Sequence, residues 1–365
     1  MSHFLPHIDR LAGYVPGEQP RDPGGIIKLN TNENPYPPSP RVAEAVEAAL
    51  ADGRLRLYPD PLGSAFRHAA ADRHGVEPEM ILAGNGSDDC LTILIRAFVG
   101  PGDAVVYPTP SYVLYRTLAE IQGASPVEVS FRPDWTLDPA DFSGTGARLA
   151  FLANPNSPSG TALSPKTVAE LALRLDCPFV VDEAYVDFAA ADCVGLIAEH
   201  PNVIITRTLS KGSSLAGLRL GYRIAWPEIV AGVNKVKDSY KCDTLSLLGG
   251  AAALADVEHL AETRRKILAT RQRLAEGVRA LGYEVPESRA NFVWCEGGPP
   301  AAEVSEALKN RKILVRLMRY PGRPEGLRVT VGTDEQIDRL LVALGEIVRG
   351  CPAPAPNSQT SNPIG

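Results

Sequence analysis

Six short apolar runs between residues 80 and 226, separated by polar loops and helical segments, constrain the fold more than any other feature of the sequence. Such runs are typical of strands in a parallel sheet that helices cover on both faces, because these strands have no solvent-facing side. The runs are Met80–Ala83, Ala104–Val106, Leu149–Leu152, Phe179–Val181, Val203–Thr206 and Tyr222–Trp226. The sequence therefore predicts an α/β fold whose sheet is mostly parallel.

The sequence after Trp226 becomes mostly helical and predicts a second, smaller α+β domain. A long amphipathic stretch, Asp256–Leu281, leads into it, and three apolar runs follow with the composition of strands. These runs are Asn291–Trp294, Ile313–Arg316 and Leu327–Val331. We expect an N-terminal arm (1–28) that joins the small domain, a large domain (29–265), the small domain (266–350) and a disordered tail (351–365).

Local signals predict several helix boundaries. Apolar residues recur at helical spacing over Pro40–Ala51 and Ser64–His74, and Gly75 is typical of a helix C-terminal cap. Thr333–Gln336 has the pattern of a capping box for a last helix that ends near Val348.

The composition argues against several classes of binding partner. The 365 residues carry a formal net charge of -6 without a basic run, which argues against a nucleic-acid partner. The N-terminus lacks a signal peptide, and no segment approaches the roughly 20 apolar residues of a membrane span, so we expect cytoplasmic residence. The six cysteines are widely spaced without a C-x-x-C pair, so neither a metal site nor a disulfide framework is indicated.

Each of the first five apolar runs is followed by a loop that contains residue types with chemical function. The loops are Gly84–Asp89, Tyr107–Tyr112, Asn154–Gly160, Asp182–Tyr185 and Arg207–Tyr222. Because parallel strands end at one edge of a sheet, where ligands bind in α/β proteins, we expect these loops to converge. Taken singly, each has an ordinary structural explanation as a turn, a helix cap or a packed aromatic residue. Five such loops at one edge are much harder to explain in this way.

The residue types in these loops match the requirements of pyridoxal phosphate. Lys211, desolvated at a strand end, can act as a nucleophile toward an aldehyde, and Asp182 can keep a pyridine nitrogen protonated. An aromatic residue such as Tyr112 can fix the plane of the ring, and the small residues of Gly84–Asp89 at a helix start form a phosphate site. Arg328 lies opposite the core-facing residues of its strand, which makes it a candidate anion binder.

The chain resembles the class-II pyridoxal-phosphate-dependent aminotransferases of fold type I, and among them most closely the histidinol-phosphate aminotransferases. The motifs that carry the resemblance are L-N-T-N-E-N-P at 29–35, G-N-G-S-D-D at 84–89, V-D-E-A-Y at 181–185, T-L-S-K at 208–211 and L-R-L-G-Y at 218–222. The resemblance covers Tyr14 to about Val348. It implies a large domain with a mostly parallel seven-stranded sheet between helices, plus a small α+β domain.

The resemblance also implies roles for individual residues. Lys211 would be the catalytic lysine that bonds to the cofactor aldehyde. The cofactor phosphate would be bound by the backbone of the 86–88 turn and by two side chains, and the residues of this set are Gly86, Ser87, Asp88, Ser210 and Arg219.

The other implied cofactor contacts concern the ring. Asp182 would pair with the pyridine nitrogen, Tyr185 with the phenolic oxygen, and Tyr112 would stack on the ring. Tyr58 resembles the tyrosine that reaches the cofactor phosphate from the neighbouring subunit, which implies a homodimer with shared sites.

On the substrate side, Tyr14, Arg316 and Arg328 resemble the residues that bind the amino donor. The activity implied is transamination of histidinol phosphate with 2-oxoglutarate to imidazole-acetol phosphate and glutamate, a step of histidine biosynthesis. The alternatives are an aromatic amino acid aminotransferase, a threonine-phosphate decarboxylase or a non-catalytic regulator that binds pyridoxal phosphate. The absence of a DNA-binding segment before the sheet domain counts against the regulator.

The sequence departs from the family pattern in three segments. Ser157 stands where the family usually has Asn, so we expect the contact to the phenolic oxygen from Asn156 or Ser157, or its loss. Ser213 and Ser214 follow Lys211 without the usual aromatic residue, and Lys241 stands after Tyr240 where the family often has Asn. These changes concern the pocket wall.

Overall fold

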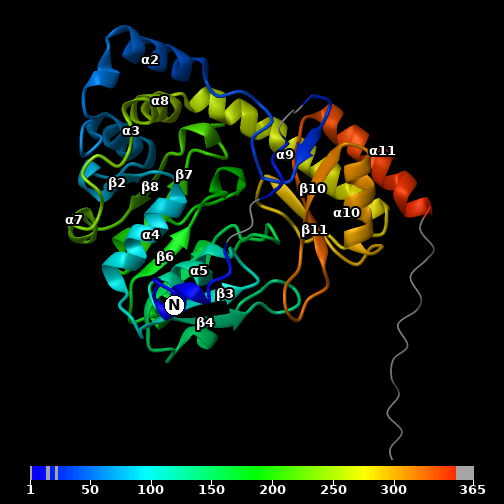
Figure 1. Ribbon diagram of the computed structural model, residues 1–365, viewed down its shortest axis with the longest axis horizontal. Coiled ribbons are helices and arrows are strands. Elements are labelled where there is room, and N and C mark those ends of the chain that lie inside the picture. Colours follow the sequence, from blue (N-terminus) through cyan, green and yellow to red (C-terminus); the bar gives the residue numbers. More distant parts are fainter. Residues whose placement is uncertain (1, 14–16, 21–23, 351–365) are drawn as a thin grey trace, which may run out of the picture.

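The computed structural model describes residues 2–13, 17–20 and 24–350, and within them it contains two sheets joined by a long helix (Figure 1). Tyr14, predicted to bind substrate, and the predicted disordered tail (351–365) lie outside the described residues. None of the helices in the described ranges combines the length and apolarity that a bilayer crossing requires.

The large sheet has seven strands in the order β2-β8-β7-β6-β5-β3-β4. All pairs that do not involve β8 are parallel, and β8 runs antiparallel to both of its neighbours. The strands are β2 (Ile81–Gly84), β3 (Ala104–Thr109), β4 (Ser125–Ser130), β5 (Ala147–Ala153), β6 (Phe179–Asp182), β7 (Val203–Thr208) and β8 (Gly221–Ile224). The predicted mostly parallel, seven-stranded sheet is confirmed.

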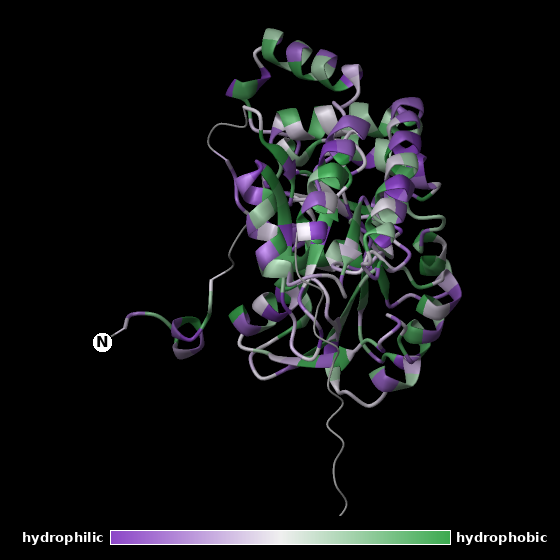
Figure 2. Ribbon diagram, turned by 90° about the vertical axis from the view of Figure 1, so that its right-hand side faces the viewer, coloured by the Kyte–Doolittle hydropathy of each residue, from purple (hydrophilic) through white to green (hydrophobic). Residues whose placement is uncertain are grey.

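The central strands are apolar throughout because both faces of the sheet are covered. Every residue of β7 is buried, and its side chains alternate between two cores, with Val203 and Ile205 on one face and Ile204 on the other. Figure 2 shows the green strands enclosed by helices that carry purple residues on their outer surfaces. The helices around this sheet are α2 (Pro40–Ala51), α3 (Ser64–His74), α4 (Ser87–Phe98), α5 (Leu114–Ile121), α6 (Pro165–Arg174), α7 (Pro227–Asn234) and α8 (Thr244–Ala255).

The small sheet has four strands in the order β1-β10-β11-β9, with helices packed against it. Its elements are β1 (Ile27–Leu29), α9 (Val257–Ala280), β9 (Phe292–Cys295), α10 (Ala301–Asn310), β10 (Ile313–Met318), β11 (Gly326–Thr330) and α11 (Asp334–Gly350). Leu327 and Val329 belong to the core of this sheet, so Arg328 points to the opposite face, as the alternation predicts. The capping box is also present, since Thr333 and Gln336 exchange side-chain to backbone hydrogen bonds of 2.9 and 3.3 Å.

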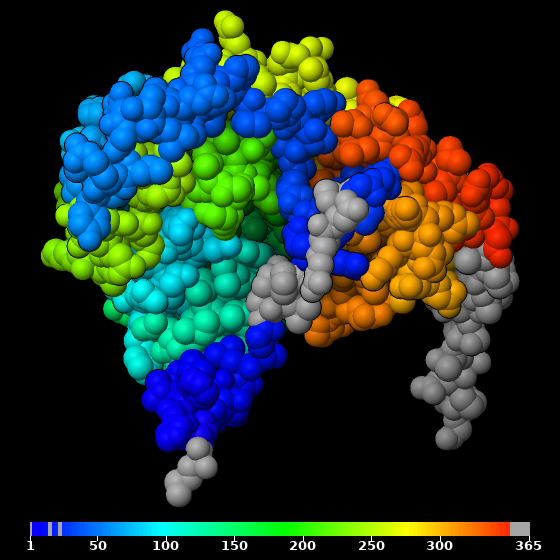
Figure 3. Space-filling model, turned by 45° about the horizontal axis from the view of Figure 1, so that its top comes forward, coloured from blue at the N-terminus to red at the C-terminus, as the bar shows by residue number. Residues whose placement is uncertain are grey.

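The N-terminal arm divides between the two sheets. Its helix α1 (Pro6–Asp9) lies against α5 of the large domain, apart from the orange and red C-terminal elements in Figure 3. Residues Ile27–Leu29, by contrast, form β1 and pair with β10 of the small sheet. The expectation that the arm joins the small domain is therefore corrected for α1.

The long helix α9 joins the two domains, and it runs without interruption from Val257 to Ala280. The predicted boundary at 265/266 falls inside it. We propose that the two domains share this helix, because one continuous helix offers no loop at which the chain could be divided.

Candidate active site

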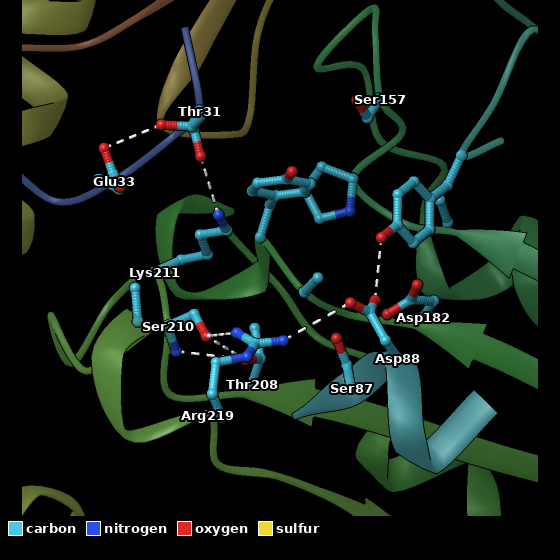
Figure 4. A pocket seen from close by; sticks show the side chains of 16 residues that line it. Thr31, Glu33, Ser87, Asp88, Ser157, Asp182, Thr208, Ser210, Lys211 and Arg219 are labelled. Carbon is cyan, nitrogen blue, oxygen red and sulfur yellow. Dashed lines mark hydrogen bonds and ion pairs between the residues drawn. The ribbon is translucent and has the colours of Figure 1, made fainter. Parts of the chain in front are cut away.

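A cavity of about 300 Å³ lies at the carboxyl ends of the strands of the large sheet (Figure 4). All five loops that were expected at this edge contribute to its lining. The residues that line it are Thr31, Glu33, Ser87, Asp88, Tyr112, Ala153, Pro155, Ser157, Asp182, Ala184, Tyr185, Thr208, Ser210, Lys211, Ala216 and Arg219.

Lys211 follows β7 and points into this cavity. Its Nζ donates a hydrogen bond of 3.2 Å to the backbone oxygen of Thr31, a residue of the segment after β1 (Figure 4). Burial disfavours the ammonium form, and the positive charge of Arg328 adds to this effect, so the pKa of Lys211 falls to about 8. A substantial fraction of the amine is therefore neutral near pH 8 and can act as a nucleophile.

Asp182 ends β6 and is held by two neutral hydroxyl groups. Tyr115 donates to Oδ2 at 2.9 Å and Thr206 donates to Oδ1 at 3.0 Å. The carboxyl is 3 % exposed, and burial raises its pKa to about 6 although both hydroxyl bonds oppose this shift. A cation placed next to this carboxylate would relieve the cost of its burial.

Tyr115 was not predicted as a site residue. It is fully buried in α5, where its ring stacks on Phe151 with centroids 4.8 Å apart, and this packing aims its hydroxyl at Asp182. The only signal in the sequence is its spacing from Tyr112, one helical turn earlier, which places both rings on the same side of the chain.

A set of anion-binding donors lies at the start of α4. Arg219 Nη1 donates to Ser210 Oγ at 3.3 Å, and Arg219 Nη2 lies 3.6 Å from Asp88 Oδ2 (Figure 4). Gly86 caps the helix with φ at +89°, and a Cβ there would lie 2.8 Å from Arg219 Nη2. The positive φ thus favours glycine at residue 86, and any larger residue would displace the guanidinium group. Free N–H groups of the first turn, a hydroxyl and a guanidinium group thus converge at one point.

Two tyrosines line the same cavity. The hydroxyl of Tyr112 donates to Asp88 Oδ1 at 2.9 Å, and that of Tyr185 accepts from Asn32 Nδ2 at 2.9 Å. Asn32 belongs to the L-N-T-N-E-N-P motif but had been given no role, since nothing in the sequence places residue 32 beside residue 185.

Asn156 lies behind the cavity wall and is not one of the described residues that line it. Its Oδ1 accepts from Ser111, and its Nδ2 donates to the backbone oxygen of Pro110 and to Ser159. Its amide is thus engaged in holding the loop, and the contact of Asn156 with the cofactor stays a prediction. Ser157 lines the cavity instead.

The two candidate substrate arginines are cross-strand neighbours in β10 and β11. Arg328 Nη1 donates to Ser157 Oγ at 2.9 Å, at the edge of the cavity, whereas its buried Nε has no hydrogen-bond partner within the described part of the chain. Arg316 borders a separate cavity of about 190 Å³, which Glu18 and Asn30 also line. The structure thus brings Arg328 to the site and places Arg316 farther out.

Tyr58 lies outside the cavity of its own chain. Its side chain is 80 % exposed and stacks on Tyr240 with ring centroids 4.5 Å apart. Other exposed apolar residues are close in sequence, namely Leu50, Leu55, Leu57 and Leu62. Tyr58 thus does not line the cavity around Lys211 but a separate one of about 280 Å³.

The donor set fits pyridoxal phosphate. The cavity presents a lysine with a lowered pKa, a buried carboxylate on a neighbouring strand and an anion-binding turn, which are the partners of an aldehyde, a pyridinium nitrogen and a phosphate. Within residues 2–13, 17–20 and 24–350, no cluster of His, Cys, Asp or Glu side chains could hold a metal ion.

Comparison with known proteins agrees with this geometry. Residues 24–344 match the family described as aminotransferase class I and II. The chain is 48% identical over 347 residues to a histidinol-phosphate aminotransferase from Rhodopirellula baltica, with 93% of this chain and 94% of that protein covered. It is 44% identical to histidinol-phosphate aminotransferase 1 from Nostoc sp., with 95% and 98% covered.

Solved structures are similar over most of the chain. The crystal structure of histidinol-phosphate aminotransferase from Sinorhizobium meliloti in complex with pyridoxal-5'-phosphate has a TM-score of 0.86 at 27% identity. The match covers 96% of this chain and 98% of that one.

Proposed function

This chain belongs to the class I and II aminotransferase family, and from that premise we propose that it converts histidinol phosphate and 2-oxoglutarate into imidazole-acetol phosphate and glutamate with pyridoxal 5'-phosphate as cofactor. The observation that carries the proposal is the convergence of Lys211, Asp182 and Arg219 in one cavity. Curated relatives with this activity in their names include proteins 43 to 48% identical to the chain, which favours this amino donor.

Lys211 is the residue that we expect to act on the reacting atoms. Pyridoxal phosphate, when bound, supplies an aldehyde and an electron-withdrawing ring for moving an amino group. The lowered pKa of Lys211 leaves its Nζ free to bond to a carbonyl carbon at moderately alkaline pH. Once released from that bond, the same Nζ would move a proton between the substrate carbon and the cofactor carbon.

Asp182 and the 86–88 turn would hold the two ends of the cofactor. The buried Asp182 carboxylate would accept a hydrogen bond from the ring nitrogen and keep it protonated, because a cation there relieves its desolvation. The backbone N–H groups of Ser87 and Asp88, with Ser210 and Arg219, would bind the phosphate. Tyr112 would stack on the ring, and the hydroxyl of Tyr185 would bond to its phenolic oxygen.

Arg328 and Arg316 would bind the acidic groups of the two substrates. An enzyme of this kind must accept both an amino-phosphate ester and glutamate, and a guanidinium group binds phosphate and carboxylate alike through paired hydrogen bonds. The buried Nε of Arg328, which lacks a hydrogen-bond partner in the described residues, favours this role.

A homodimer in which Tyr58 reaches the partner's cofactor phosphate would explain the exposed apolar surface around Tyr58. Mixed dimers of Lys211→Ala and Tyr58→Ala subunits test this part. If Tyr58 acts across the interface, each mixed dimer contains one complete site, and mixing two inactive preparations restores activity. Failure of mixing to restore activity, with dimer exchange verified, would contradict the shared site.

The amino donor is tested by half-reactions of the purified enzyme. The visible absorption of the lysine-bound cofactor is followed after adding histidinol phosphate, glutamate or phenylalanine alone. We expect rapid loss of this absorption with histidinol phosphate and with glutamate, and slow loss with phenylalanine. Rapid reaction with phenylalanine and none with histidinol phosphate would instead identify an aromatic amino acid aminotransferase.

A further inference from the structure

Lys241 lies in the segment between α7 and α8, where the family often has Asn. Its Nζ forms an ion pair with Asp89 Oδ1 at 2.7 Å, and the two side chains are only 12% and 15% exposed. Asp89 lies in the first turn of α4, 152 residues earlier in the chain. The pair therefore joins two distant segments in a mostly dry environment, where electrostatic interactions are stronger than at the surface.

Asp89 shapes the turn that precedes α4. Its Oδ2 accepts a hydrogen bond of 3.0 Å from the backbone N–H of Asn85. Gly84 makes room for this arrangement, since a Cβ at residue 84 would lie 3.0 Å from Asp89 Oδ2. The carboxylate thus closes the turn whose next residue, Gly86, caps the helix and precedes the N–H groups of the anion-binding site.

The first turn of α4 carries two adjacent carboxylates, Asp88 and Asp89. Uncompensated, both would repel a phosphate dianion bound at the same turn and would oppose the attraction of the helix N-terminus. Arg219 lies 3.6 Å from Asp88, and Lys241 contacts Asp89. Each carboxylate thus has a cation beside it, and the cation beside Asp89, which also lies 3.5 Å from the exposed Asp238, comes from the segment after α7.

We propose that Lys241 is a positioning residue for the cofactor phosphate: it neutralises Asp89 and fixes the turn from which the N–H groups of α4 bind the phosphate. This inference rests on the proposed function, because it assumes that pyridoxal phosphate binds in the cavity. Lys241 does not itself line that cavity, so its effect reaches the phosphate through Asp89 and the Asn85–Gly86 turn.

The segment that carries Lys241 also contacts the surface around Tyr58. Tyr240 stacks on Tyr58, and Lys237 Nζ donates to the backbone oxygen of Pro61 at 3.0 Å. Lys241 is thus located between the phosphate-binding turn and the surface that carries the proposed cross-subunit tyrosine.

The test compares the affinities of the cofactor-free protein for pyridoxal phosphate and for pyridoxal, which lacks the phosphate. Lys241→Met removes the cation and retains the length of the side chain. We expect the preference for pyridoxal phosphate over pyridoxal to fall by about tenfold, because one buried negative charge near the phosphate is no longer compensated. Lys241→Arg should retain most of the preference.

Removing the other partner should have the opposite effect. Asp89→Asn leaves the Lys241 cation near the phosphate while the amide oxygen can still accept from Asn85, so we expect the preference to rise. The double variant should return toward the wild-type value. Lys237→Met is the matched control, since it loosens the same segment without removing the partner of Asp89. We expect it to leave the preference for pyridoxal phosphate over pyridoxal unchanged.

The outcomes separate this inference from the proposed function. If the unaltered protein does not bind pyridoxal phosphate, both fail together. If it binds, but Lys241→Met and Asp89→Asn leave the preference for pyridoxal phosphate over pyridoxal unchanged, or shift it in the same direction, only the inference about Lys241 is overturned. If Lys241→Met does not fold, the expected rise in the preference of Asp89→Asn for pyridoxal phosphate over pyridoxal still tests the inference.

Discussion

Asp182→Asn should make the cofactor-free protein more stable near neutral pH while removing its ability to hold a protonated pyridine ring. The carboxyl is buried, and its pKa is raised from 3.8 to about 6. A carboxyl whose pKa is higher in the folded state contributes stability below its unfolded pKa, and this contribution is lost as the pH rises through the folded pKa. Asparagine has nearly the same shape and carries no charge.

The size of the effect follows from the two pKa values. With a pKa of 3.8 unfolded and about 6 folded, the titration of Asp182 lowers the free energy of unfolding by about 2 kcal/mol at pH 5, where the buried carboxyl is still mostly protonated, and by about 3 kcal/mol at pH 7. The asparagine variant avoids this cost. It can still bond to the hydroxyls of Tyr115 and Thr206, which can rotate to donate or accept.

The assay is urea unfolding of the cofactor-free wild type and Asp182→Asn at pH 5, 6 and 7. We expect the variant to be more stable, with an advantage that grows by about 1 kcal/mol from pH 5 to pH 7. Asp176→Asn, which removes an exposed carboxylate in the same domain, is the control and should change stability by less than about 0.5 kcal/mol. An advantage that is absent at pH 7, or that does not grow with pH, would refute the reasoning.

Three further variants test other parts of the account. Glu183→Gln should destabilise the protein by about 1–2 kcal/mol in urea unfolding, because it removes one of the two carboxylates that contact the buried Arg207, at 2.7 Å, and leaves Asp192 at 3.1 Å; no loss of stability would contradict this. Gly221→Ala should weaken cofactor affinity in absorption titrations, because its Cβ would lie 2.5 Å from the backbone nitrogen of Ser87, and wild-type affinity would show that the turn can move. Phe66→Ala should lower the free energy of unfolding by about 3–5 kcal/mol, because it leaves a cavity in the core. It should not change the affinity of the folded protein for the cofactor, so a variant that keeps wild-type stability but binds the cofactor weakly would contradict this.

The buried strands and several helices could be predicted because their signals are local. The runs that became β6 and β7 are apolar on both faces, and the predicted bounds of α2 and α3 agree with the structure. By contrast, β4 was missed, because Ser125–Ser130 is an edge strand with exposed residues and a proline. The pairing of β1 with β10 joins residues 27 and 313, and no local pattern encodes it.

The site could be predicted only as far as the loops at the strand ends. The lysine and carboxylate belong to segments whose end positions follow from the parallel sheet. The residues that orient them depend on tertiary packing: Tyr115 reaches Asp182 from a helix, and Asn32 reaches Tyr185 from the N-terminal segment. The engagement of the Asn156 amide within its own loop depends on tertiary packing in the same way, and the sequence does not show it.

The central claim is that Lys211 holds the cofactor, and reductive trapping tests it most directly. The purified enzyme is saturated with pyridoxal phosphate, treated with borohydride, digested and mapped by mass spectrometry. We predict that the reduced cofactor is found on the peptide that contains Lys211, and that a Lys211→Ala variant lacks both this adduct and the visible absorption of the bound cofactor. A stoichiometric adduct on another lysine, with the absorption of Lys211→Ala unchanged, would contradict the account.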